Sequence, residues 1–122
     1  MVIGSHVILY SKNADADRAF LRDVLEFSSV DAGHGWLIFK LPPAEIALHP
    51  GEDKSDVHKM LPAGFYLICD DLQATIKSLE AKKVKCTAVT KERWGILTTI
   101  QLPSGGELGL YQPLHPTALH LS

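Results

Sequence analysis

Imidazole and carboxylate side chains recur in this chain at positions that a β-sheet would bring to one face. An alternating apolar run near the start carries His6, and the run "AEIALHPGE" near the middle carries Glu45 and His49. A later run, "GELGLYQPL", repeats its rhythm and carries Glu107. Imidazoles and carboxylates bind divalent metal ions and transfer protons. Two of each on one face would therefore be a set of the right chemical kind for a metal site.

Aromatic and very small side chains are interleaved with these polar ones. Side chains two residues apart share one face of a strand. On that face the expected strands carry Tyr66 and Tyr111 together with three small residues, Ala47, Gly64 and Gly109. The opposite face of the same strands is uniformly aliphatic, as expected for a face that a helix covers. A polar, aromatic and hollowed face indicates a concave ligand site rather than a packed core.

An internal repeat organises the elements that must position these residues. The stretch "SHVILYSKNADADRAFLRDVL" aligns with "AGFYLICDDLQATIKSLEAKK" at one constant offset, and "WLIFKLP" aligns with "LTTIQLP". Each copy contains an alternating apolar run, a polar capping residue (Asn13 or Asp71) and an amphipathic helical pattern. Each half therefore predicts a strand, a helix and then further strands, with residues 51–61 as the polar connector between the halves.

The periodicity predicts the following elements. The first helix is expected within residues 14–27 and the second from residue 72 onward. Strands are expected at residues 3–10, 36–41, 44–49, 63–69, 84–90, 95–102 and 106–112, with a further short strand around 28–33. The fold class is α+β. Two βαβββ modules, about 1–55 and about 62–113, form a single domain over residues 1–122, with a curved, mostly antiparallel eight-stranded sheet and the helices on its outer face.

Length, composition and charge restrict the classes of function. A chain of 122 residues with 46% hydrophobic content forms one domain with a sizeable core. A net charge of −2 without runs of like charge argues against nucleic acid or a membrane surface as a partner. No leader-like or membrane-spanning stretch is found, so the cytoplasm is the expected location. Cys69 and Cys86 lie in apolar segments, which favours buried thiols over a disulfide or a zinc pair.

The stretches "SHVILYSKNADADRAFLRDVLEF" and "LPSGGELGLYQP" resemble the vicinal oxygen chelate superfamily, which includes glyoxalase I, bleomycin-resistance proteins and extradiol dioxygenases. The resemblance covers nearly the whole chain. It rests on His6 in the first strand, on the helix end "AFLRDVLEF" and on the Pro-x-Gly hairpin before the last strand. It implies paired βαβββ modules and a homodimer. Glu26 stands where the superfamily usually has a glycine after the first helix.

The resemblance also maps the four metal-ligand positions of the superfamily's enzymes onto this chain. They fall on His6, Ala47, Gly64 and Gly109, of which only His6 is a ligand type. A catalytic divalent site generally needs three protein ligands around an open position. The expected protein therefore has no metal cofactor and uses the vacated positions to bind a small molecule.

A shifted metal site is the alternative. Glu45, His49 and Glu107 lie two residues along their strands from the vacant positions and could join His6 in holding zinc, nickel, iron or manganese. Two residues along a strand span about 6.6 Å, whereas metal–ligand bonds are near 2 Å, so this site would require the strands to slip. In that enzyme Glu107 would be the catalytic group that moves a proton.

Three functions follow from these readings. The preferred one is a binding protein of the bleomycin-resistance type, which sequesters a partly aromatic small molecule in a pocket lined by His6, Trp36, Tyr66 and Tyr111. The second is a metal-dependent lyase or dioxygenase that uses the shifted site. The third is an assembly partner that binds no small ligand. Bound metal would single out the second, and a ligand-dependent melting temperature would separate the first from the third.

Overall fold

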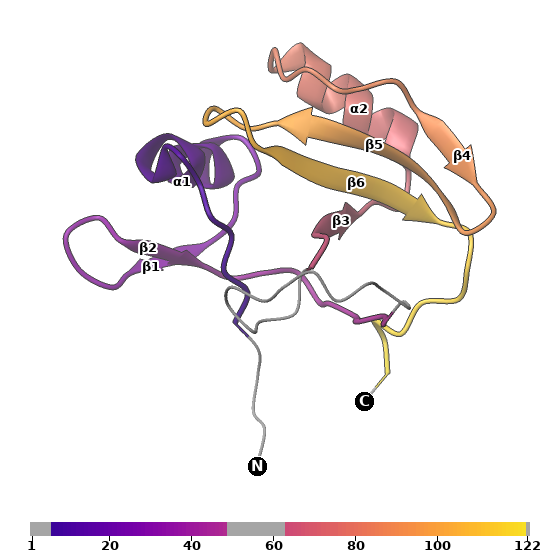
Figure 1. The fold of residues 1–122 in the computed structure, drawn as a ribbon, viewed down its shortest axis with the longest axis horizontal. Helices are drawn as coiled ribbons and strands as arrows, with labels where there is room; N and C mark the ends of the chain where they lie inside the picture. Colours follow the sequence, from indigo (N-terminus) through magenta and orange to yellow (C-terminus); the bar gives the residue numbers. More distant parts are fainter. Residues whose placement is uncertain (1–5, 49–62, 122) are drawn as a thin grey trace, which may run out of the picture.

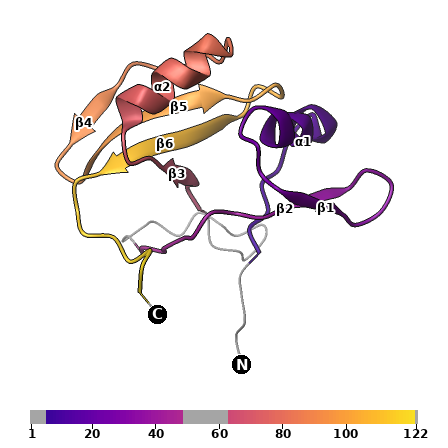
Figure 2. The same cartoon turned by 180° about the vertical axis from the view of Figure 1, so that it is seen from behind.

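The computed structural model of the protein describes residues 6–48 and 63–121. In chain order the elements are α1 (Ala14–Asp23), β1 (Ser29–Asp31), β2 (Leu37–Phe39), β3 (Tyr66–Ile68), α2 (Leu72–Ala81), β4 (Thr90–Glu92), β5 (Gly95–Gln101) and β6 (Glu107–Pro113). Figures 1 and 2 show α2 lying across one face of the larger sheet, with α1 and the β1–β2 hairpin together at the far side from β4. Neither helix in these ranges has the length and hydropathy needed to cross a bilayer.

Two separate sheets are present in the described ranges, where one eight-stranded sheet was expected. The larger has the order β3-β6-β5-β4, with β3 parallel to β6 and the other neighbours antiparallel. The smaller is the antiparallel β1–β2 hairpin. The α+β class and the strand, helix and hairpin order of the second half are as predicted, whereas the described part of the first half, residues 6–48, contains a helix and a short hairpin.

Two expected strands are not formed where the structure describes them. Residues 6–10 and 44–48 have no strand assignment and pair with no strand in the described ranges. The expected strand at 84–90 is reduced to a single bridge between Cys86 and Ile100, and β4 begins only at Thr90. Alternating apolar residues favour an extended chain, but a strand is stabilised by its neighbours. The prediction for these segments was therefore wrong because periodicity does not supply a pairing partner.

The hydrophobic core lies between α2 and the larger sheet. Its buried side chains come almost entirely from the second half of the chain: Phe20, Cys69, Leu72, Ile76, Leu79, Val84, Ile100, Leu108 and Leu110. Leu108 and Leu110 belong to the face of β6 that was predicted to lie under a helix. Asp71 caps α2 by accepting a hydrogen bond from the Ala74 N–H at 3.1 Å. The predicted parity of the last strand and the predicted cap are both confirmed.

The two cysteines are free thiols. Burial raises the pKa of the Cys69 thiol. A hydrogen bond with the Thr75 side chain acts in the opposite direction, but the net pKa is raised. Burial also raises the pKa of Cys86. Both thiols therefore stay protonated near neutral pH and act as small apolar side chains, in agreement with the expectation from the sequence.

Glu26 provides the turn out of α1 at the position where the resemblance leads one to expect glycine. Its φ is +59°, in the left-handed region. The Phe27 N–H donates to the Leu21 carbonyl at 3.0 Å. This hydrogen bond closes the helix end as in a Schellman motif, in which the residue before the donor, here Glu26, is usually glycine. The local turn is thus kept although the glycine is not, at the conformational cost of a left-handed non-glycine residue.

A buried carboxylate ties α1 to the turn between β5 and β6. Asp17 accepts hydrogen bonds from the Ser11 hydroxyl at 2.6 Å and from the Ser104 N–H at 3.0 Å. Burial raises the pKa of Asp17, but the hydrogen bonds from Ser11 and Ser104 outweigh it, and the net pKa is lowered. The folded state therefore prefers the charged carboxylate more strongly than the unfolded chain does.

Replacing Asp17 by asparagine is expected to lower the free energy of unfolding at pH 7 by about 1–2 kcal/mol, because hydrogen bonds to a charged acceptor weaken. The folded pKa lies below the unfolded one, so this stabilisation is complete above about pH 4 and is lost as the pH falls through the folded pKa. Urea unfolding at pH 7 and pH 3 should show the two proteins converging at the lower pH. Asp15→Asn, at an exposed position two residues earlier, is the control, and an equal loss there would contradict the role of Asp17.

Candidate ligand-binding site

Three aromatic side chains gather on the face of the larger sheet opposite α2. The rings of Tyr66 in β3 and Tyr111 in β6 are 5.7 Å apart between centroids and inclined by 85°. The ring of Trp94, in the turn before β5, is 5.8 Å from that of Tyr111 and inclined by 74°. Tyr66 remains 45% exposed and Trp94 43% exposed. We call Tyr66, Trp94 and Tyr111 the aromatic face.

Two glycines make room for the ring of Tyr66. A Cβ at Gly109 would lie 2.2 Å from Cδ1 of Tyr66, and a Cβ at Gly64 would lie 3.3 Å from its Cε2. Gly109 is also the register partner of Tyr66 across the β3–β6 pair. The space that the sequence predicts for a ligand above Gly109 therefore holds a side chain of the protein itself, and the aromatic face is a surface rather than a deep pocket.

The phenol of Tyr111 is held by a histidine from the segment after β6. Its hydroxyl oxygen lies 3.2 Å from Nε2 of His115, and Nδ1 of that ring lies 2.7 Å from the carbonyl oxygen of Pro116. A carbonyl can only accept, so Nδ1 carries a proton, and in the tautomer with Nε2 unprotonated that nitrogen accepts a hydrogen bond from the phenol. Burial, with the negative charge of Glu45 as a second cause, raises the pKa of Tyr111. Tyr111 is therefore a neutral donor with a fixed direction.

A carboxylate lies close enough to influence this phenol. Oε2 of Glu45 accepts a hydrogen bond from the Ala118 N–H at 3.0 Å, which joins the segment around residue 45 to the C-terminal segment, as Figure 1 shows. The other oxygen, Oε1, is buried and has no hydrogen-bond partner in the described ranges. A buried carboxylate oxygen without a partner retains full capacity to accept from a donor or to face a positive charge.

The other residues expected in the site lie elsewhere. His6 is exposed and makes no hydrogen bond with the described residues, and Ala47 is exposed as well. Trp36 lies at the start of β2, where its ring is 4.5 Å from the Arg18 guanidinium of α1. Figure 1 places that hairpin away from β3 and β6. His49 falls outside the described residues. The structure thus brings together Tyr66 and Tyr111 with the two glycines beside them.

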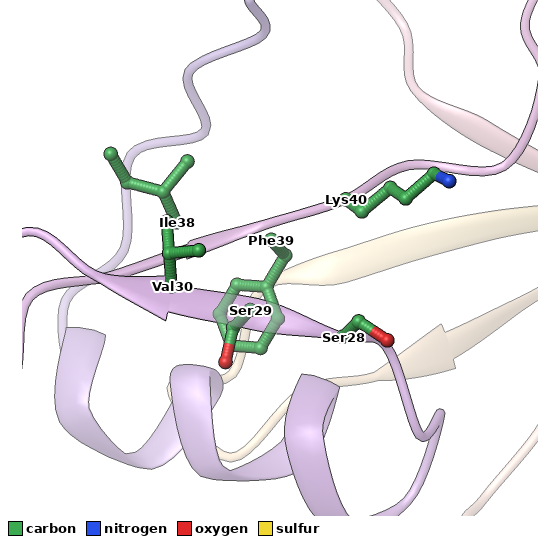
Figure 3. Close-up of a pocket in the computed structure, with 6 residues that line it drawn as sticks. All are labelled: Ser28, Ser29, Val30, Ile38, Phe39 and Lys40. Atoms are coloured by element: carbon green, nitrogen blue, oxygen red, sulfur yellow. The ribbon is translucent and has the colours of Figure 1, made fainter.

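Two shallow hollows lie outside the aromatic face. Glu107 lines one of about 290 Å³, together with Lys85, Cys86, Thr87, Thr99 and Gln101. The other, of about 370 Å³, lies at the β1–β2 hairpin and is lined by Ser28, Ser29, Val30, Ile38, Phe39 and Lys40. Figure 3 shows Val30 and Ile38 side by side on the side of the hairpin away from α1. Glu107 therefore shares its hollow with Lys85, and His6 is not among the residues that line it.

The donor groups do not fit the metal site implied by the resemblance. Of the four mapped positions, only His6 offers a ligand, and the ring of Tyr66 fills the space beside Gly109. Within residues 6–48 and 63–121, no three histidine, cysteine, aspartate or glutamate side chains lie together as a metal-binding group. Glu45 and Glu107 have separate surroundings, and His49, the other member of the shifted site, lies outside the described residues.

Solved structures show where this architecture is found. The chain is similar to a lactoylglutathione lyase from Agrobacterium tumefaciens, with 21% identity, TM-score 0.61, and 90% of this chain and 92% of the other covered. It is similar to TnmS3, an antibiotic binding protein from Streptomyces sp. CB03234, with 24% identity, TM-score 0.59, and coverage of 93% and 99%. The chain has the fold of these proteins. An integron cassette protein from the Halifax Harbour Sewage Outfall metagenome has 15% identity and TM-score 0.61, with coverage of 91% and 99%. The sequence matches no protein-family model and no curated protein.

Two members of the site were not expected from the sequence. Sequence reasoning did not place Trp94 or His115 in the site, because a turn and a segment after the last strand carry no periodicity that assigns their side chains to a face. One signal was present for Trp94. A Cβ at the next residue, Gly95, would lie 3.0 Å from Cδ2 of Tyr111. That glycine lets the ring of Tyr111 lie close to the turn and to Trp94.

Proposed function

We propose that the protein binds a small, partly aromatic molecule on the aromatic face. The observation that carries this proposal is the exposure of Tyr66 and Trp94 on a sheet whose other face is a packed core. Rings held nearly perpendicular to Tyr111 offer both a face and an edge to an incoming planar group. Aromatic side chains have only two rotatable side-chain angles, so they lose little conformational entropy when a ligand binds.

The polar groups around Tyr111 suggest the chemistry of that molecule. Glu45 supplies a carboxylate oxygen that has no partner among the described residues, and the faces of Tyr66 and Trp94 attract positive charge. A planar ligand with a cationic or hydrogen-bond-donating substituent would stack on the rings and pair with the carboxylate. Sequestration of such a molecule needs no reaction and no metal, which agrees with the donor groups present.

The comparisons are compatible with this proposal and with one alternative. One protein of the same fold is an antibiotic binding protein and another is a lactoylglutathione lyase. Binding is favoured because the tyrosine ring occupies the space beside Gly109, and no metal-binding group of side chains is found within residues 6–48 and 63–121. A near-stoichiometric zinc, nickel, iron or manganese content that is lost in His6→Ala would instead support a metal-dependent lyase or dioxygenase.

Titration with proflavine, a planar cationic dye, tests the proposal, with uncharged acridone as the neutral comparison. Proflavine is expected to raise the melting temperature saturably, and Trp94→Ala should weaken its binding at least about fivefold, since stacking on an aromatic side chain contributes about 1–3 kcal/mol. Trp36→Ala is the matched control, because this tryptophan lies beside Arg18. Equal losses in the two variants, or no saturable binding of either compound, would contradict the proposal.

A further inference from the structure

One of the two hollows opens on the same side of the larger sheet as the aromatic face. We call it the polar hollow; it is lined by Lys85, Cys86, Thr87, Thr99, Gln101 and Glu107. Thr99 and Gln101 flank the buried Ile100 in β5. Glu107 precedes the buried Leu108 in β6. Because neighbouring residues of a strand point to opposite faces, these three polar side chains point away from the core beneath α2.

The strand registers place the polar hollow next to the ring of Tyr66. Gly109 in β6 is the register partner of Tyr66 in β3 and of Thr99 in β5. Neighbouring strands are about 4.8 Å apart, so the backbone of Thr99 is about 10 Å from that of Tyr66. The Tyr66 ring lies against Gly109, between the two. A substituent attached directly to a planar group on this ring can therefore enter the hollow.

The side chains of the polar hollow have hydrogen-bonding capacity for a ligand. Lys85 and Glu107 line the same hollow, yet neither forms a salt bridge within residues 6–48 and 63–121. Gln101 adds an amide, which both donates and accepts. The Thr99 hydroxyl oxygen lies 3.1 Å from that of Thr87, and one hydrogen bond leaves a hydroxyl with further capacity.

The mixture of charges in the polar hollow favours a neutral group that carries hydroxyls. An anionic group would face the Glu107 carboxylate, and a cationic group would face the Lys85 ammonium. A hydroxyl donates to a carboxylate and accepts from an ammonium, so adjacent hydroxyls of one ring can satisfy both. The hollow of about 290 Å³ is smaller than the roughly 300–1,000 Å³ of sites that enclose a whole drug-sized ligand. It therefore suits one part of a larger molecule.

We propose that the polar hollow binds a sugar-like, polyhydroxylated ring attached directly to the planar group that stacks on the aromatic face. The ligand is then an aryl glycoside rather than a simple aromatic compound. This inference rests on the proposed function, because it requires the planar part to bind at Tyr66 and Trp94. Glu107 and Lys85 determine specificity, since together they disfavour a charged group in place of the sugar.

Calorimetric titration of the full chain with two coumarins tests this proposal. Skimmin is the β-glucoside of umbelliferone, and herniarin is its methyl ether, so the two differ only in the group on one oxygen. Skimmin is expected to bind at least about fivefold more tightly, because the sugar adds hydrogen bonds in the hollow. Glu107→Ala and Gln101→Ala should each bring the ratio of the two affinities toward one. Trp94→Ala should weaken both compounds and keep the ratio.

Glu80→Ala is the matched control for the loss of a carboxylate. Glu80 is exposed on α2, which Figure 1 shows on the other face of the sheet, so this variant should keep the wild-type ratio. Circular dichroism verifies that Glu107→Ala and Gln101→Ala, both at exposed positions, are folded.

The failure of this proposal differs from the failure of the proposed function. If proflavine binds saturably but skimmin binds no more tightly than herniarin, the role of the polar hollow is wrong and the aromatic face keeps its role. A preference for skimmin that survives both Glu107→Ala and Gln101→Ala places the sugar elsewhere and also overturns the proposal. No saturable binding of proflavine, skimmin or herniarin overturns the proposed function together with this inference.

Discussion

Replacing Gly109 by alanine is expected to destabilise the folded protein by about 1–3 kcal/mol, the usual cost of inserting atoms into a packed site. The new Cβ would lie 2.2 Å from Cδ1 and 2.6 Å from Cε1 of Tyr66, so one of the two must move. The backbone of Gly109 is fixed by its N–H, which donates to the Phe65 carbonyl at 3.2 Å, and by its place between β3 and β5. The ring of Tyr66 therefore has to rotate away.

A double-mutant cycle with Tyr66→Ala isolates this effect. If the ring is the cause, Gly109→Ala should cost little in the Tyr66→Ala background, with a coupling of at least 1 kcal/mol. Gly106→Ala is the control, because its Cβ would meet only the Ser104 hydroxyl oxygen, at 3.4 Å. Chemical denaturation supplies the free energies. Additive losses would contradict the close packing of Tyr66 on Gly109 and, with it, the geometry of the aromatic face.

The second half of the fold could be predicted from the sequence because its local signals agree with one another. Asp71 begins α2, and the period-two alternation of β6 assigns Leu108 and Leu110 to the helix side and Tyr111 to the other side. These assignments follow from chain geometry alone, since neighbouring residues of a strand point to opposite faces. They needed no knowledge of what lies across the sheet.

The first half could not be predicted in the same way, although the repeat makes it look equivalent. Periodicity determines which side chains share a face, but the length of a strand depends on its neighbours. β5 and β6 are seven residues long and pair with each other along their whole length, whereas β1 and β2 are three residues long. The segments around Ile8 and Ile46 carry the strand pattern without a partner in the described ranges.

The candidate site was predicted in part for the same reason. Tyr66 and Tyr111 lie on regular strands, so parity placed them together. Trp94 and His115 lie in a turn and in a segment after the last strand, where side-chain direction depends on tertiary contacts. The two glycines were correctly assigned to the face of Tyr66, but the sequence alone could not distinguish space for a ligand from space for a neighbouring ring.

Truncation of Ile100 to alanine is expected to have the largest effect on stability, about 2–5 kcal/mol, out of the 5–15 kcal/mol typical of a domain. Ile100 lies in β5 and is 0% exposed. It is the register partner of Leu108 in β6 and belongs to the core beneath α2. Removing its branched side chain loses the transfer free energy of the buried methyl and methylene groups. It also leaves a cavity between α2 and the larger sheet, because the hydrogen bonds between β5 and β6 hold the sheet in place.

A graded series makes this prediction sharper. Ile100→Val should cost about 0.5–1.5 kcal/mol, whereas Val89→Ala, at an exposed position, should stay within about 0.5 kcal/mol. Urea denaturation must be run at several protein concentrations, because association stabilises the folded state by mass action. A loss from Ile100→Ala that is the same at every protein concentration would place the damage inside each chain. A loss below about 1 kcal/mol would show that α2 does not pack on β5 as the buried residues indicate.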